Sequence, residues 1–231
     1  MKLDYAFLIL QKLRENYNIF SESFAKRREK PWPEIESLIL KYLKEKDKVL
    51  DLGSGAGQYF PIFQKKKVEY FGLDFSEKLV EIAKKRYPKA KFFVGDALNL
   101  PFSDNFFDKV AAIAILHHIP SDELRNRFLQ EIYRVLKKEG ILILTCWYLY
   151  KKPQKFAILK YNLLKLLKLS KLDFNDIIFP LGEIKNCYFH CFKKEELENL
   201  LILNKFYLLE SGFLKRSNKN ENLFIVAKKP L

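Results

Sequence analysis

Short apolar runs alternate with amphipathic segments along the first two thirds of the chain. Such runs, bounded by polar or glycine-rich stretches, are typical of buried strands in a parallel sheet. The runs that predict strands are 48–52, 70–74, 91–94, 107–115 and 141–147. Because strands that alternate with helices favour right-handed crossover connections, we expect a mostly parallel sheet.

The segments between these runs carry helix signals. Ser76 is a good N-cap for a helix over 77–87, and Pro88 ends it. Apolar residues recur at helical spacing over 122–136, and Gly140 is expected to close that helix. The other expected elements are helices at the N-terminus, near Gln58 and over 194–201, and strands at 206–210 and 223–228 that pair as an edge hairpin.

The stretch 151–171 breaks this alternation. It contains seven lysines and no acidic residue, and its apolar residues at 156, 159, 163, 166 and 167 follow helical spacing. We expect an amphipathic basic helix inserted after the fifth strand. Its lysines form either a solvated surface or contacts to RNA phosphates.

Composition adds a hint about partners. The chain has 231 residues, which suits one domain, and its 42 Lys and Arg against 28 Asp and Glu give a net charge of +14. This excess favours a polyanionic partner, nucleic acid first, although a lysine-filled surface would have the same composition. Three cysteines argue against a disulfide framework, and the segment 187–191 lacks the paired cysteines of a zinc site, so no metal is expected.

A glycine-rich turn follows the first strand. The segment 49–57 reads Val-Leu-Asp-Leu-Gly-Ser-Gly-Ala-Gly, and glycine lets the backbone turn sharply beside a ligand. A dinucleotide fingerprint would need glycine at position 58, which is Gln58, and Asp51 would repel a pyrophosphate. The spacing D-x-G-x-G-x-G resembles instead motif I of class I methyltransferases, whose cofactor S-adenosylmethionine carries a sulfonium cation.

Two further acids follow the next two strands. Asp74 ends the second strand, and Asp96 follows the third, at the sheet edge where ligands bind in open α/β folds. The resemblance implies that Asp74 accepts hydrogen bonds from both ribose hydroxyls and that Asp96 meets the adenine amine. It also implies a Rossmann-like α/β fold with a mostly parallel seven-stranded sheet, an antiparallel edge strand and helices on both faces.

Blocks outside this motif are similar to the tRNA methyltransferases that esterify 5-carboxymethyluridine at the wobble position. The blocks are Arg28-Glu29-Lys30-Pro31-Trp32-Pro33, Ile113–Ile119 and Tyr188-Phe189-His190-Cys191-Phe192. The first block is the most specific, and the resemblance spans almost the whole chain. It implies the anticodon region of tRNA as partner, and enzymes of this family often work with a small activating subunit.

These patterns predict three groups of site residues. The catalytic residues are expected to be His117 and Arg28. The expected cofactor-binding residues are Tyr17, Asp51, Gly53, Ser54, Gly55, Gly57, Asp74, Phe75, Asp96, Ala97, Ala114 and Leu116. The expected substrate-binding residues are Arg28, Trp32, His117, Tyr188, His190, Lys151, Lys152 and Lys155.

The acceptor decides whether the reaction needs a base. A carboxylate with an ordinary pKa of about 4 is already ionised at pH 7, so the enzyme would only align and desolvate it, with Arg28 or His117 as its holder. A hydroxyl or ring nitrogen would need a base such as His117. Two other functions stay open: methylation of a quinone or lipid precursor, with 151–171 lying on a membrane surface, or a non-catalytic subunit.

We expect a single methyltransferase domain over 1–231. Its parts are a helical cap (1–46), a cofactor-binding core (47–147), a basic helical insert or substrate cap (148–192) and a C-terminal helix and hairpin (193–231). The apolar run at 5–10 is too short to span a bilayer and precedes no cleavage site. The N-terminus is therefore expected to be a helix, and the protein to be cytoplasmic, without integral membrane association.

Overall fold

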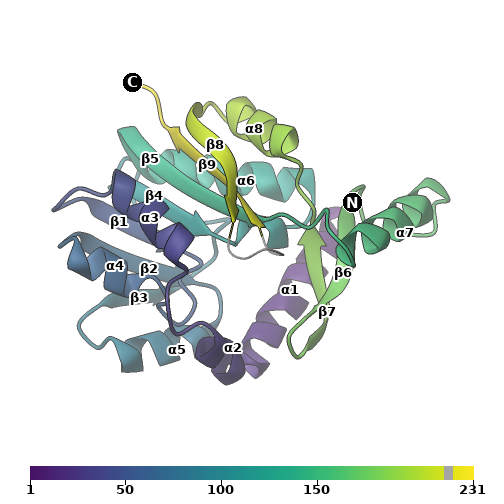
Figure 1. The fold of residues 1–231 in the computed structure, drawn as a ribbon, viewed down its shortest axis with the longest axis horizontal. Helices are drawn as coiled ribbons and strands as arrows, with labels where there is room; N and C mark the ends of the chain where they lie inside the picture. The colour runs from purple at the N-terminus through teal and green to yellow at the C-terminus, as the bar shows by residue number, and fades with distance from the viewer. Residues whose placement is uncertain (216–220) are drawn as a thin grey trace.

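The computed structural model describes residues 1–215 and 221–231, and its centre is a seven-stranded sheet with the order β3-β2-β1-β4-β5-β9-β8 (Figure 1). The strands are β1 (Lys48–Leu52), β2 (Glu69–Asp74), β3 (Lys91–Val94), β4 (Phe107–Ile113), β5 (Leu136–Trp147), β8 (Tyr207–Lys215) and β9 (Glu221–Lys228). The first five pair in parallel, and β9 pairs antiparallel with both β5 and β8. The predicted fold class is confirmed, with the antiparallel strand one place in from the edge.

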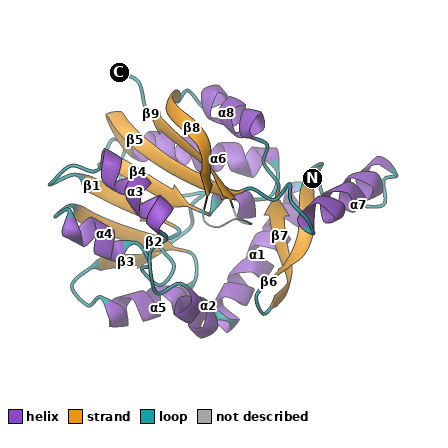
Figure 2. Ribbon diagram, in the orientation of Figure 1, coloured by secondary structure: helices purple, strands orange, loops and turns teal. Residues whose placement is uncertain are grey.

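Helices cover both faces of this sheet (Figure 2). On one face lie α3 (Pro33–Tyr42), α4 (Phe60–Lys65) and α5 (Glu77–Arg86), and on the other lie α6 (Asp122–Val135) and α8 (Lys194–Leu203). Strand β1 contributes to the buried clusters on both faces of the sheet, because successive strand residues point to opposite faces. Val49 packs on the first face, and Leu50 and Leu52 pack on the second.

The chain before β1 closes over the carboxyl edge of the sheet. It contains α1 (Leu3–Ile19) and α2 (Ser21–Arg27) as well as α3. The side-chain oxygen of Asn18 accepts a hydrogen bond from Ser76 Oγ at 2.7 Å, at the start of α5. The Gln58 amide donates to the carbonyl of Lys30 at 2.8 Å, which fastens the segment after α2 to the glycine-rich turn.

Between β5 and α8 the chain forms a helix and a hairpin that lie outside the main sheet. The helix α7 (Gln154–Leu166) is the predicted basic helix, and it projects from the body of the molecule (Figure 1). Strands β6 (Asp176–Leu181) and β7 (Ile184–His190) pair antiparallel and pack on α1. This hairpin was not expected from the sequence, although Gly182, with φ +59°, marks its turn.

The junction of α6 and β5 differs from the expectation. Helix α6 ends at Val135 and β5 begins at the next residue, so Gly140 lies inside a strand and does not close the helix. A Cβ at Gly140 would lie 2.7 Å from the carbonyl oxygen of Lys137. The glycine therefore permits a close backbone approach in a strand whose register shifts near its start.

Across the two described ranges, the helices are all too short or too polar to cross a membrane.

Candidate active site

A cavity of about 540 Å³ lies at the carboxyl edge of the sheet, under α1 and α2. This volume is in the range of small-molecule sites, which is about 300–1,000 Å³. The sequence-predicted residues that line it are Tyr17, Arg28, Gly53, Ser54, Gly55, Asp74, Phe75, Asp96, Ala97 and Ala114. The structure thus brings together residues from the N-terminal helices and from four strand ends.

Asp74 is oriented in this cavity by backbone amides. Its Oδ2 accepts a hydrogen bond from Gly55 N at 2.8 Å, and its Oδ1 accepts one from Ser76 N at 2.9 Å. Burial raises the pKa of Asp74 to about 6, although the backbone hydrogen bonds act to lower it. The carboxylate is therefore ionised at neutral pH and can accept hydrogen bonds from ligand hydroxyls.

The glycine-rich turn places backbone without side chains at the cavity wall. Gly53 and Gly55 have φ of +77° and +54°, a region that side chains rarely adopt. The amides of Gly53 and Ser54 donate to the carbonyl of Leu73 at 2.8 and 3.1 Å, which ties the turn to β2. Asp96 also lines the wall, with Oδ1 accepting from Leu98 N at 2.8 Å. Two oriented acids beside this turn fit a ligand with hydroxyls, an amine and a cationic centre.

Three predicted cofactor residues lie behind this wall. Asp51 points to the face of the sheet opposite Leu50 and Leu52, where it accepts a hydrogen bond from Tyr70 Oη at 2.9 Å. Gly57 turns the backbone at φ +78°, and a Cβ there would lie 3.0 Å from the rings of Tyr87 and Phe92. Leu116 is buried in the core. The structure therefore places all three outside the cavity lining.

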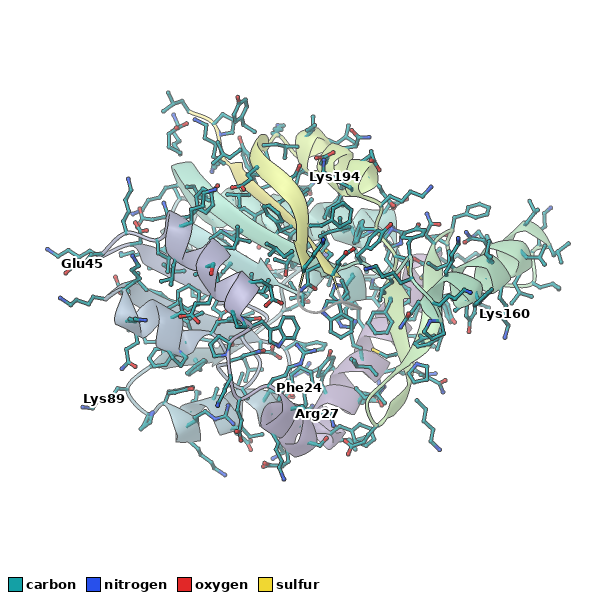
Figure 3. All side chains as sticks on the ribbon, viewed as in Figure 1. Phe24, Arg27, Glu45, Lys89, Lys160 and Lys194 are labelled. Carbon is teal, nitrogen blue, oxygen red and sulfur yellow. The ribbon has the colours of Figure 1, made fainter. Side chains whose placement is uncertain are left out.

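Arg28 brings a positive charge to the cavity wall. Its guanidinium carbon lies 4.5, 5.1 and 5.5 Å from the ring centres of Phe24, Trp32 and Trp147. Aromatic faces hold a planar guanidinium by cation–π attraction, and Phe24, a residue of α2, is one of these rings (Figure 3). Trp32, expected to bind substrate, is outside the cavity lining and supports Arg28 instead.

The turn η1 (Leu116–His118) contains two histidines, of which His117 was expected to meet the substrate. In the structure His118 lines the cavity and His117 does not. His118 Nδ1 donates to the carbonyl of Tyr188 at 3.0 Å, so Nε2, 3.3 Å from Tyr17 Oη, is the accepting nitrogen. His117 is fully buried, with its ring centre 5.2 and 5.9 Å from those of Trp147 and Phe189, and its Nε2 has no hydrogen-bond partner in the described part of the chain.

Neither histidine is suited to remove a proton at neutral pH. Burial lowers the pKa of His118 to about 4. Burial, with His118 and Arg28 nearby, lowers the pKa of His117 well below its ordinary value. Burial also raises the pKa of Tyr17, so its hydroxyl stays protonated. This end of the cavity therefore suits a substrate atom that arrives already deprotonated.

Tyr188 and His190 point away from the cavity, contrary to the expected substrate contact. They alternate along β7 with Phe189, which faces the histidines of η1. Tyr188 Oη and His190 Nδ1 both lie 2.7 Å from Asp176 Oδ1, and His190 Nε2 lies 2.7 Å from Glu196 Oε1. Burial alone would lower the pKa of His190, but its hydrogen bonds to the two carboxylates outweigh burial and raise it.

Replacing His190 by Gln should destabilise the fold by about 2 kcal/mol, because Asp176 and Glu196 lose the charge-assisted hydrogen bonds that the His190 ring makes to them. The pKa of His190 is raised in the folded state, so its contribution is complete below the unfolded pKa of about 6.5 and is lost as pH rises through the folded pKa. Urea unfolding at pH 6 and pH 9 tests this. An equal difference between wild type and variant at both pH values would exclude a charged His190.

The predicted substrate lysines Lys151, Lys152 and Lys155 lie at the start of α7, outside the cavity lining. Lys151 Nζ is 3.0 Å from Glu221 Oε2, and Lys152 and Lys155 are exposed. From these positions they can meet only a substrate that extends beyond the cavity.

Comparisons with known proteins agree with this geometry. The sequence family described as "Methyltransferase domain" matches residues 50–144, which run from β1 to β5 and include the glycine-rich turn. The chain contains a methyltransferase domain. Its fold is that of class I enzymes, and its cofactor is S-adenosylmethionine.

Two curated relatives differ in the substrate that their names give. The tRNA (carboxymethyluridine(34)-5-O)-methyltransferase of Xenopus tropicalis is 35% identical over 155 residues, which are 67% of this chain and 23% of the relative. The demethylmenaquinone methyltransferase of Thermotoga maritima is 36% identical over 143 residues, 61% of this chain and 60% of the relative. The methyltransferase domain thus spans less than two thirds of either relative.

Two solved structures share the fold over most of the chain. A SAM-dependent methyltransferase of Methanosarcina mazei is 25% identical with a TM-score of 0.73, over 84% of this chain and 97% of that one. A methyltransferase of Haloferax volcanii, solved with the Trm112 methyltransferase activator, is 18% identical with a TM-score of 0.68, over 94% of this chain and 97% of that one.

Affinity for S-adenosylmethionine should fall as pH decreases through about 6, because protonation of Asp74 removes its negative charge. Calorimetric titrations between pH 5 and pH 8 would measure this. Burial raises the pKa of the neighbouring Asp51 to about 7, so it titrates in the same range. An Asp51→Asn variant should keep the pH dependence, and an Asp74→Asn variant should lose it; the reverse pattern would assign the titration to Asp51.

Proposed function

We propose that this methyltransferase domain transfers a methyl group to the carboxylate of a 5-carboxymethyl group on the wobble uridine of a tRNA. The observation that carries the proposal is Arg28, held by three aromatic rings at the cavity wall beside two histidines with lowered pKa values. A cationic wall without an efficient base fits a carboxylate, which is anionic and needs no deprotonation. The Xenopus relative, named for carboxymethyluridine, supports this acceptor.

In this mechanism the residues of the chain bind and orient the reactants. S-adenosylmethionine supplies the methyl group when bound. Asp74 and Asp96 hold it through its hydroxyls and amine, and the Tyr17 ring faces the same cavity. Arg28 holds the carboxylate through charge-assisted hydrogen bonds, and α1 and α2 exclude water from it. His118 stays neutral and shapes the acceptor end of the cavity.

We propose that the lysines at the start of α7 bind the phosphates of the tRNA. Lys151 and Lys152 follow the end of β5 and precede α7, Lys152 is exposed, and the chain carries a net charge of +14. Lysine binds phosphate as a point charge and reads no sequence, so these contacts would hold the tRNA while the cavity selects the modified base.

A small activating subunit is proposed as a further partner. The support is the Haloferax methyltransferase, which shares this fold and was solved with the Trm112 methyltransferase activator. Co-expression with such an activator, followed by affinity purification of this chain, tests the pairing; separate elution of the two proteins would contradict it.

A second candidate function is methylation of a small molecule, favoured by the Thermotoga relative named for demethylmenaquinone. A neutral quinol would bring no negative charge to the cavity wall at Arg28, and removal of its hydroxyl proton would need a base. The non-catalytic function is disfavoured because Asp74, Asp96 and the glycine-rich turn all meet at one cavity.

The deciding experiment is methyl transfer from labelled S-adenosylmethionine to total tRNA that carries unesterified carboxymethyluridine, with and without the activator. Nucleoside analysis should find a base-labile methyl ester at the wobble uridine. tRNA that lacks the carboxymethyl group is the matched control and should gain no label. Labelling of a demethylated quinone but not of either tRNA would overturn the proposal.

A further inference from the structure

The helix α7 presents apolar side chains to solvent. Phe156, Leu159 and Leu163 are 60%, 58% and 56% exposed, and Leu166 and Leu167 are also more than half exposed. These residues, which we call the outer face of α7, are three or four positions apart and so lie on one side of the helix. The opposite side packs on the protein through Ile158, which is 4% exposed.

The outer face of α7 is bordered by positive charge. Lys155 and Lys160 lie on its two sides, and the segment 151–172 contains no acidic residue. Lys160 lies on the part of α7 that projects from the body of the molecule (Figure 3). A cationic border around an apolar stripe complements a partner that is apolar within and negative at its surface.

Two other kinds of partner, single-stranded RNA and a second copy of this chain, fit the outer face of α7 less well. Single-stranded RNA stacks its bases on aromatic rings, whereas four of the five side chains on the outer face are leucines, which have no planar ring. A second copy of the chain in a two-fold interface would bring the same lysines of both copies together, which repel each other.

We propose that the outer face of α7 binds the surface of an anionic lipid bilayer. An interfacial helix inserts its apolar residues among the acyl chains, while its lysines meet the negative headgroups. The helix lies flat on the surface and stays attached to β6, so binding needs no spanning segment. This inference does not depend on the identity of the methyl acceptor.

The test is cosedimentation of the intact chain with vesicles of phosphatidylcholine and phosphatidylserine, compared with vesicles of phosphatidylcholine alone. The wild type should bind the anionic vesicles in preference and should release them as salt is raised. The variant Leu159→Ser with Leu163→Ser should bind at least about tenfold more weakly. Lys155→Gln with Lys160→Gln should weaken binding only to the anionic vesicles.

The variant Ile202→Ser with Leu203→Ser is the matched control, because both side chains are exposed on α8, away from α7. It should bind vesicles as the wild type does, and all variants should keep their affinity for S-adenosylmethionine. Failure of the wild type to bind anionic vesicles would overturn the proposal. So would a leucine variant that binds vesicles normally but loses affinity for tRNA or changes its oligomeric state.

Discussion

Replacing Arg28 by Ala is expected to reduce methyl transfer to carboxymethyluridine tRNA by about a thousandfold. The change removes the positive charge that lines the acceptor end, and charge-assisted hydrogen bonds in a site closed to water are each worth about 1.5–3 kcal/mol. The affinity for S-adenosylmethionine should change little, because Asp74 and Asp96, the acids proposed to hold it, stay in place. Single-turnover rates at saturating cofactor, with separate cofactor titrations, measure both effects.

Arg28→Lys is the informative companion to this variant. Lysine keeps the charge but loses the planar group that three rings hold, so activity should return only in part. Arg14→Gln is the matched control, since Arg14 also lines the cavity but forms an ion pair with Glu77. Equal losses in the Arg14 and Arg28 variants would argue against a specific carboxylate holder.

Replacing Asp74 by Asn is expected to weaken S-adenosylmethionine binding by about a hundredfold. Two backbone amides orient the carboxylate, and an amide in its place accepts weaker hydrogen bonds and must turn an NH₂ toward one donor. The loss should appear in the cofactor dissociation constant, with the melting temperature little changed.

Asp96→Asn provides the comparison within the same cavity. Asp96 accepts one backbone hydrogen bond, from Leu98, and is proposed to meet only the amine of the cofactor, so its replacement should cost less than that of Asp74. If the two variants lose affinity equally, the proposed division between the hydroxyls and the amine is wrong.

The parallel sheet was predictable because its signals are local. Runs such as 48–52 and 91–94 coincide with β1 and β3, and the helix capped by Ser76 begins where its N-cap places it. The hairpin of β6 and β7 was not predicted because it packs on α1, more than 150 positions earlier in the chain, and this contact leaves no periodic pattern. The basic helix before it was predicted because amphipathic spacing needs no knowledge of the partner.

The sequence predicted which strand ends supply residues to the site. It did not predict toward which face of the sheet each side chain points. Asp74 is the last residue of β2 and faces the cavity, whereas Asp51, within β1, faces Tyr70. The same one-residue alternation separates Phe189, beside the histidines of η1, from His190, which faces Asp176. Which of His117 and His118 lines the cavity depends on the short turn η1, whose direction no sequence rule fixes.

The packing of α1 has a consequence for biosynthesis. Leu13 and Tyr17 are buried with Cys187 and Phe189, so α1 gains these packing partners only after β7 has been synthesised. Because a non-local contact forms only once both partners are present, α1 lacks these contacts until the segment through β7 has been synthesised. The wall of the cavity that α1 supplies is incomplete until then, and a nascent chain truncated before β7 would hold the glycine-rich turn without this support of its cover.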